Sequence, residues 1–127
     1  MQEKYLFEYA VIRVVPKVER EEFLNVGVIL YCASQRFLKC TFEVNEIRLS
    51  AFACEVETSI INSNLKAIEK ICMGGAEAGP IGQLDIASRF RWLTATRSTV
   101  VQASKVHPGF CIDPEETLQK LQQQLVL

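Results

Sequence analysis

The sequence predicts an α+β fold: an antiparallel sheet of about four strands with helices packed on one face, a two-layer sandwich. Three observations carry this prediction. Val- and Ile-rich apolar runs fill the N-terminal part, short turns separate them, and helical periodicity with capping signals follows. A chain of 127 residues, 49% hydrophobic and 23% charged, has the size and composition of one folded unit. We therefore expect a single domain over residues 1–127.

The first two predicted strands are the most apolar segments of the chain. Residues 5–15 carry apolar side chains on both alternating faces, which is the pattern of a central strand covered on both sides. Pro16 ends this strand, and the charged segment 17–22 reads as a loop. A second strand is predicted over residues 23–33. Gly27 within it indicates a bulge or the close approach of another backbone.

The middle of the chain changes from strand to helix. Residues 37–44 alternate between apolar and polar, and the tight turn at 34–35 makes this strand antiparallel to its predecessor. A capped helical turn is expected at 45–49. A longer helix is predicted over residues 56–73, because apolar residues recur there at helical spacing, and the glycines at 74–75 stop it.

The last third is predicted as loop, helix, strand, turn and helix. Residues 74–82 form a glycine-rich loop, and Asp85 caps a brief helix that ends at Leu93. Residues 98–103 are the best remaining strand, because they include three consecutive β-branched side chains. Residues 106–109 read as a turn. The final helix has the clearest signal in the chain, with Asp113 as N-cap and proline at its first position.

Composition and motifs exclude several classes of protein. The formal net charge of −1 disfavours wholesale binding to nucleic acid or to a membrane surface. No signal-peptide core and no apolar run near the roughly 18 residues of a membrane span are found, so we expect a cytoplasmic protein. Five cysteines without a Cys-x-x-Cys pair predict buried free thiols rather than disulfides or a zinc site. Nucleotide-binding and metalloprotease motifs are missing, so no cofactor or metal is indicated.

One segment departs from the overall charge balance. Residues 86–112 contain no acidic residue and four basic ones, Arg89, Arg91, Arg97 and Lys105. This imbalance predicts an anion site or a surface for an acidic partner. An arginine fork with adjacent hydroxyls such as Ser98 can hold a phosphate or a carboxylate. The structural alternative is that Arg97 pairs with Glu22 or another carboxylate.

Two other groups each have a functional and a structural interpretation. Arginines interleaved with Phe90 and Trp92 can stack on single-stranded nucleic acid, or the aromatic rings are core anchors and the arginines face solvent. Asn25 and Glu22 can line a cleft, or Asn25 satisfies backbone groups at a bulge.

His107, the only imidazole, lies four residues before Cys111. A reactive thiolate needs the two side chains within hydrogen-bond reach, which a turn does not guarantee. Ser98 has no nearby base and no nucleophile-elbow motif, so the sequence does not support serine hydrolysis.

Three segments, at residues 9–16, 22–28 and 89–102, resemble a bacterial family known as domain of unknown function 3037. The His-Pro-Gly at 107–109 and the Asp-Pro at 113–114 fit the same family. The resemblance implies no activity. It implies a possible protein partner, a HipA-like serine/threonine kinase. The recurring positions of the family, which have no assigned roles, correspond to Glu22, Asn25, Gly27, Arg89, Trp92, Arg97, Ser98 and His107.

Our leading hypothesis is a non-enzymatic interaction module that acts with such a kinase and presents a basic pocket. The pocket would be built from Arg13, Arg89, Arg91, Arg97 and Lys105, with Glu22, Asn25, Ser98 and His107 as further binding residues. The first alternative is a small enzyme acting on a phosphorylated or nucleotide substrate at Arg97 and Ser98. The second is a nucleic-acid-binding domain, which the near-neutral charge disfavours.

Overall fold

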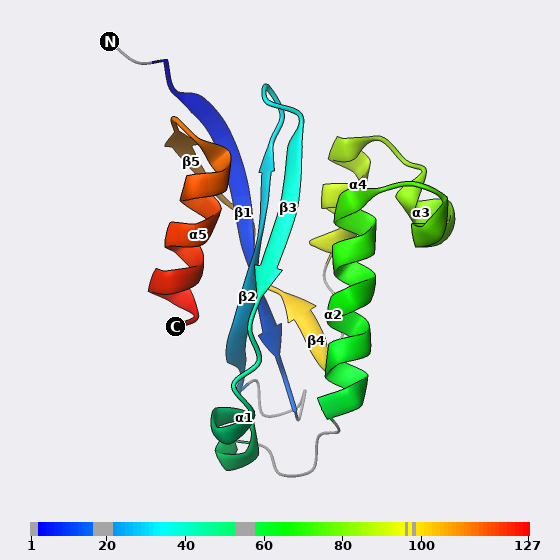
Figure 1. Cartoon of the computed structure of the whole chain (residues 1–127), viewed down its shortest axis with the longest axis vertical. Coiled ribbons are helices and arrows are strands. Elements are labelled where there is room, and N and C mark those ends of the chain that lie inside the picture. Colours follow the sequence, from blue (N-terminus) through cyan, green and yellow to red (C-terminus); the bar gives the residue numbers. More distant parts are fainter. Residues whose placement is uncertain (1–2, 17–21, 53–57, 96, 98) are drawn as a thin grey trace.

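Strand β1 (Tyr5–Val14) is the central strand of an antiparallel sheet in the computed structural model of the chain (Figure 1). The structure describes residues 3–16, 22–52, 58–95, 97 and 99–127. The strand order is β3–β2–β1–β4, and β5 also pairs with β1. The other strands are β2 (Leu24–Cys32), β3 (Phe37–Phe42), β4 (Val101–Ala103) and β5 (His107–Cys111). The helices are α1 (Glu46–Phe52), α2 (Thr58–Met73), η2 (Ala76–Ala78), α3 (Gly79–Gly82), α4 (Ile86–Leu93) and α5 (Pro114–Leu125).

The predicted α+β class and antiparallel sheet are confirmed. The predicted turn at residues 106–109 is wrong, because residues 107–111 form β5. His-Pro-Gly resembles a turn signal, but an edge strand tolerates proline where its missing N–H would have faced solvent. The predicted strand at 98–103 is shorter in the structure, since β4 begins at Val101.

Strands β4 and β5 lie end to end along the same edge of β1. Strand β4 pairs with residues 12–14 of β1, and β5 pairs with residues 5–9. Between these two ladders, residues 10–11 of β1 face residues 104–106, so the outer strand carries one extra residue, as in a β-bulge. Ser104 hydrogen-bonds to β1 at this bulge. Its N–H donates to the carbonyl of Val11 at 2.8 Å, and its Oγ accepts from the Val11 N–H at 2.8 Å.

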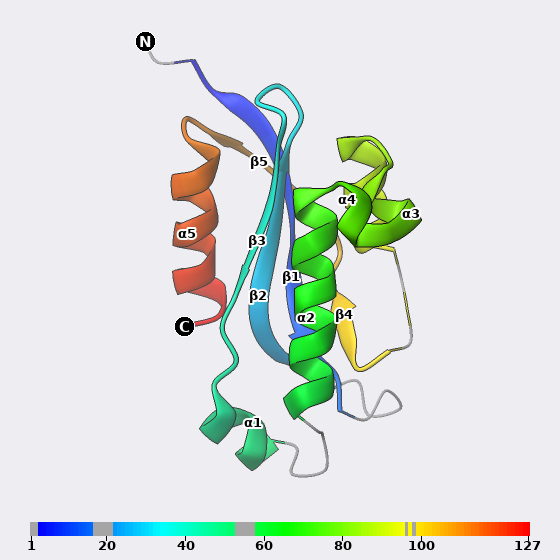
Figure 2. The same ribbon diagram turned by 45° about the vertical axis from the view of Figure 1, so that its right-hand side comes forward.

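The helices are divided between both faces of the sheet rather than gathered on one face as predicted (Figures 1 and 2). Alternate side chains of β2 enter two separate apolar clusters. Ile29 and Tyr31 pack with α2 and α4, whereas Val28 and Leu30 pack with α5. The physical reason is that β1 and β2 are apolar on both faces, so each face requires a cover. The double-sided pattern of residues 5–15 already contained this requirement.

Gly27 is a position that no other residue could fill without rearrangement. A Cβ atom built there would lie 2.8 Å from the Cβ of Phe42 on β3 and would also collide with the carbonyl oxygen of Thr41. The register between β1 and β2 shifts beside it, between Ile12 and Arg13. The predicted bulge with close backbone approach is therefore confirmed.

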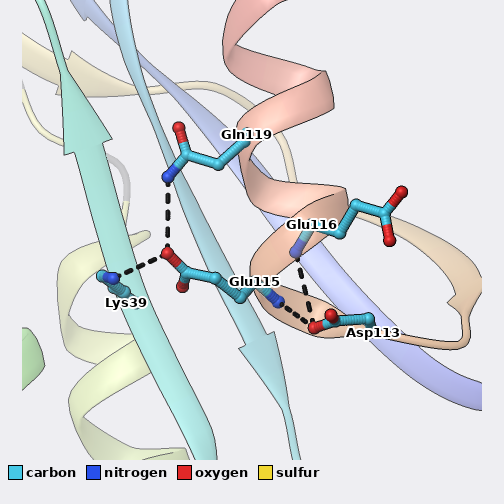
Figure 3. A network of polar contacts seen from close by, with 5 residues as sticks. All are labelled: Lys39, Asp113, Glu115, Glu116 and Gln119. Atoms are coloured by element: carbon cyan, nitrogen blue, oxygen red, sulfur yellow. Dashed lines mark hydrogen bonds and ion pairs between the residues drawn. The ribbon is translucent and has the colours of Figure 1, made fainter.

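The predicted helix caps are present. Asp85 accepts a hydrogen bond from the N–H of Ser88 at 2.7 Å, and Asp113 accepts from the N–H of Glu115 at 3.0 Å. The Ser88 side chain and backbone together hold the pKa of Asp85 below its usual value. Glu115 also forms an ion pair with Lys39 at 2.8 Å, which links the start of α5 to β3 (Figure 3). Among the described helices, none is long and apolar enough to cross a membrane.

Replacing Ser104 by alanine should lower the free energy of unfolding by about 1–3 kcal/mol, because the buried N–H of Val11 would lose its acceptor. Urea unfolding monitored by circular dichroism measures this change. Ser63→Ala on the exposed side of α2 is the control and should change stability by less than about 0.5 kcal/mol. Equal stabilities of the two variants would contradict the assigned role of Ser104.

Candidate functional site

Arg89 ties the C-terminal end of α2 to α4. Its Nη1 atom donates to the carbonyls of Ile71 and Cys72, both at 2.8 Å, and its Nε atom donates to the carbonyl of Leu84 at 3.1 Å. The last carbonyls of a helix have no partner within the helix and carry partial negative charge, so a guanidinium group is well suited to bind them. Gly74 leaves room for it, because a Cβ there would lie 2.7 Å from Nη1. Arg89 is therefore engaged in holding the fold.

Arg91 and Arg97 each have a different partner. The Nη2 atom of Arg91 donates to both carboxylate oxygens of Glu8 on β1, at 3.1 and 2.9 Å, in an exposed ion pair. The guanidinium of Arg97 lies 3.9 Å from the ring centre of Trp92 and donates to the carbonyl of that residue. Of the two predicted aromatic anchors, Phe90 is fully buried, as expected of a core anchor, whereas Trp92 is 39% exposed.

Arg13 and Asn25 are brought side by side. They face each other across β1 and β2 at the bulge, and the Arg13 guanidinium lies 3.9 Å from the ring centre of Phe23. The Asn25 amide donates to the carbonyl of Leu125 at the end of α5. Within the described part of the chain, the Nε of Arg13 and the Oδ1 of Asn25 are buried and have no hydrogen-bond partner. The Asn25 side chain thus binds the end of α5, and its interpretation as a residue that satisfies backbone groups at the bulge stays a prediction.

The remaining predicted site residues lie apart from these. Glu22 is exposed next to Phe23 and takes part in an interaction of its own. Lys105 is exposed in the bulge between β4 and β5. Ser98 lies outside the described residues. The gathering of five basic side chains in one pocket stays a prediction, and Arg89, Arg91 and Arg97 already have partners on separate elements.

His107 and Cys111 lie at opposite ends of β5, four residues apart along an extended strand, which separates their backbones by about 13 Å. The His107 ring packs against Tyr9, with 5.3 Å between ring centres. Burial raises the pKa of the Cys111 thiol, and a hydrogen bond with Cys40 together with burial raises that of Cys72. Protonated buried thiols are poor nucleophiles. The four described cysteines are buried free thiols, as predicted, and Cys54 lies outside the described residues.

A surface that the sequence did not reveal lies at the N-terminal end of β1. Leu6, Phe110 and Ile112 are 55%, 71% and 50% exposed. Leu6 and Phe110 are direct partners across β1 and β5, and Ile112 is two residues further, on the same face. We call these three residues the edge patch. The turn interpretation of residues 106–109 concealed it, because the alternation of Phe110 and Ile112 is visible only when β5 is recognised as a strand.

The backbone beside the edge patch faces outward. The N–H and C=O groups of Val11 point towards the β4–β5 side of β1. Because these groups alternate in direction from residue to residue along a strand, the N–H and C=O groups of Tyr5, Phe7 and Tyr9 point to the same side. Their partners on β5 are Cys111, Gly109 and His107. The residues between these partners, Phe110 among them, therefore direct their backbone groups away from β1, towards open solvent at the edge of the sheet.

A hollow of about 260 Å³ adjoins the same edge on the α5 side. Its wall combines apolar atoms with charges of both signs. The lining residues are Lys4, Phe110, Cys111, Ile112, Asp113, Glu116, Thr117 and Lys120. In the described part of the chain, the end of the sheet at β5 thus presents exposed apolar side chains, a hollow that Phe110 and Ile112 help to line, and backbone groups without a partner.

Arg89→Met should destabilise the protein by about 2–3 kcal/mol, because three backbone carbonyls lose a charged donor. Arg91→Met is the matched control on the same helix. It removes only an exposed ion pair and should cost less than about 1 kcal/mol. Guanidinium chloride unfolding of both variants measures the difference, and equal losses would contradict the structural role of Arg89.

Comparison with known proteins adds a family. No curated protein and no solved structure matches the chain. A family model described as protein of unknown function (DUF3037) matches residues 9–126, from the middle of β1 to the end of α5. The chain therefore belongs to the DUF3037 family of proteins of unknown function.

Proposed function

We propose that the chain is a non-enzymatic protein-interaction module and that the edge patch is its binding surface. The observation that carries this proposal is the exposure of Phe110, 71%, beside Leu6 on the unpaired edge of the sheet. Neighbouring apolar side chains that remain in water are typical of binding surfaces, and aromatic residues are enriched there. Covering each of these side chains with a partner lowers the free energy, because apolar surface is removed from water.

The surroundings of the patch support recognition of a protein rather than of a small apolar molecule. The exposed Lys4 side chain precedes β1, and the Arg91–Glu8 ion pair lies on the same face of β1 as Leu6. Charged groups around an apolar centre give the polar rim that protein interfaces have. The HipA-like kinase implied by the family resemblance is the partner to test first.

Phe110→Ser should reduce the recovery of a co-expressed HipA-like kinase homologue at least tenfold when the two proteins carry separate tags. The loss of a buried aromatic anchor at an interface typically costs 2 kcal/mol or more. Met73→Ser is the matched control, because Met73, the last residue of α2, is also an exposed apolar side chain, 79% exposed, and is not part of the edge patch. Thermal unfolding should show both variants as stable as the wild type. Recovery that is equal for both variants, or no complex with the wild type, would count against the proposal.

Arg13 supports a second candidate function, the binding of a phosphate-bearing ligand. A half-buried guanidinium with an unpartnered Nε donor is a suitable group for an anionic oxygen. Inorganic phosphate at ten times its dissociation constant should raise the free energy of unfolding by about 1.4 kcal/mol. Arg13→Gln should abolish this increase, whereas Lys66→Gln, which removes an exposed charge from α2, should retain it. An identical phosphate response in the two variants would rule out Arg13 as the binding group.

A further inference from the structure

We infer that β5 pairs with β5 of a second copy of this chain, antiparallel, about a two-fold axis that passes by Phe110. The inference rests on the edge patch being the binding surface proposed above, and it adds the partner and the register. Among the described residues, β5 pairs with β1 alone, on its inner side, and α5 packs mainly on β2 and β3, so the outer side of β5 is available to a further strand.

The hydrogen-bonding groups of the edge are complementary to themselves in this register. The outward groups belong to Pro108, Phe110 and Ile112, and Pro108 has no N–H to offer. With Phe110 opposite Phe110 of the second copy, these two residues exchange two hydrogen bonds. The N–H of each Ile112 then donates to the carbonyl of Pro108 in the other copy. A register centred on Pro108 would instead lose its two central bonds.

The backbone remains extended far enough for this pairing. Asp113, the N-cap of α5, has φ −128° and ψ 110°, which are strand values. The chain bends at Ile112 as it turns into the helix, so of the groups of Ile112 it is the N–H, which follows directly on β5, that is presented to the edge. On the other side, the bulge at residues 104–106 and the ring of Pro108 end the pairing. The paired segment is thus limited to residues 108–112 of each copy.

Charge complementarity favours a second copy as the occupant. The register that pairs Phe110 with itself brings His107 of each copy towards Asp113 of the other, because these residues flank the paired segment at equal distances from Phe110. These two residues are exposed, and they are an imidazole and a carboxylate. The Asp113 carboxylate caps α5 through Oδ1 and has further lone pairs that can accept from an imidazole N–H. The shared axis forms this pair twice.

The side chains of the other face become an apolar row. Leu6 and Phe110 of one copy continue into Phe110 and Leu6 of the other, and Ile112 meets Pro108. The row covers the exposed apolar side chains of the edge patch with their own counterparts, as an isologous interface requires. Two five-residue segments make a small contact, so the association is weak and reversible at moderate protein concentration.

Sedimentation equilibrium of the full chain, followed up to about 1 mM, tests the inference, because interfaces of small area associate in that range. The wild type should change from monomer to dimer as concentration rises. Phe110→Pro should remain monomeric, since it removes the outward N–H without touching a hydrogen bond of the monomer. His107→Ala should weaken the dimer severalfold, and Met73→Ser should leave it unchanged. A wild type that stays monomeric, or a dimer that survives Phe110→Pro, overturns the inference.

Cysteine cross-linking tests the register. With oxidised glutathione as oxidant, two Phe110→Cys chains should join through a disulfide, and the glutathione disulfide takes up their two electrons and two thiol protons and leaves as two molecules of reduced glutathione. Directly opposed residues of a hydrogen-bonded pair have Cα atoms about 5.5 Å apart, which a disulfide can span. Lys105→Cys, exposed but outside the paired segment, should form no such product. If both variants or neither cross-link, the register is wrong.

The same variants separate this inference from the proposed function. Loss of kinase binding in Phe110→Ser together with a monomeric wild type would overturn the dimer and leave the edge patch as a surface for another protein. A dimer that is abolished by Phe110→Pro, in a chain that binds no kinase, would support the dimer and overturn the kinase as partner.

Discussion

Strand β1 has apolar side chains on both of its faces, and neither face can be left in water without a large loss of hydrophobic free energy. This constraint determines most of the architecture. One face is covered by α2 and α4, and the other is covered by α5, whose start is fastened to β3 by the ion pair between Glu115 and Lys39. The two covers come from different parts of the chain. Helix α5 is therefore as necessary to the sheet as α2.

The arginines show why a charge anomaly in a sequence is weak evidence for a site. Residues 86–112 have no acidic member, yet two of their arginines have partners from outside the segment. Arg91 pairs with Glu8 of β1, and Arg89 binds the terminal carbonyls of α2. Backbone carbonyls carry no formal charge and have no sequence signature. A tally of charged residues therefore overestimates how much positive charge is left for a ligand.

Local signals predicted the elements well, and tertiary requirements explain the differences. The caps at Asp85 and Asp113 and the bulge at Gly27 follow from short-range geometry, so they were predictable from a few adjacent residues. Strand β5 was not, because Pro108 and Gly109 disfavour a strand locally, and only pairing with β1 stabilises one there. The edge patch was missed for the same reason. Of the predicted site, Arg13 and Asn25 are brought together by a cross-strand register that no spacing in the sequence reveals.

The bulge at residues 104–106, beside Ser104, affects how the chain tolerates insertions and deletions. In an uninterrupted strand, adding or deleting one residue rotates every following side chain to the opposite face. Here the registers of the two ladders of the outer strand already differ by one residue, and Ser104 binds Val11 between them through its backbone N–H and its hydroxyl. Length variation between residues 104 and 106 can be absorbed at this bulge. The outer strand thus consists of two independently paired parts, β4 and β5. The sequence of β5, which carries Phe110, can change while β4 keeps its register with Arg13.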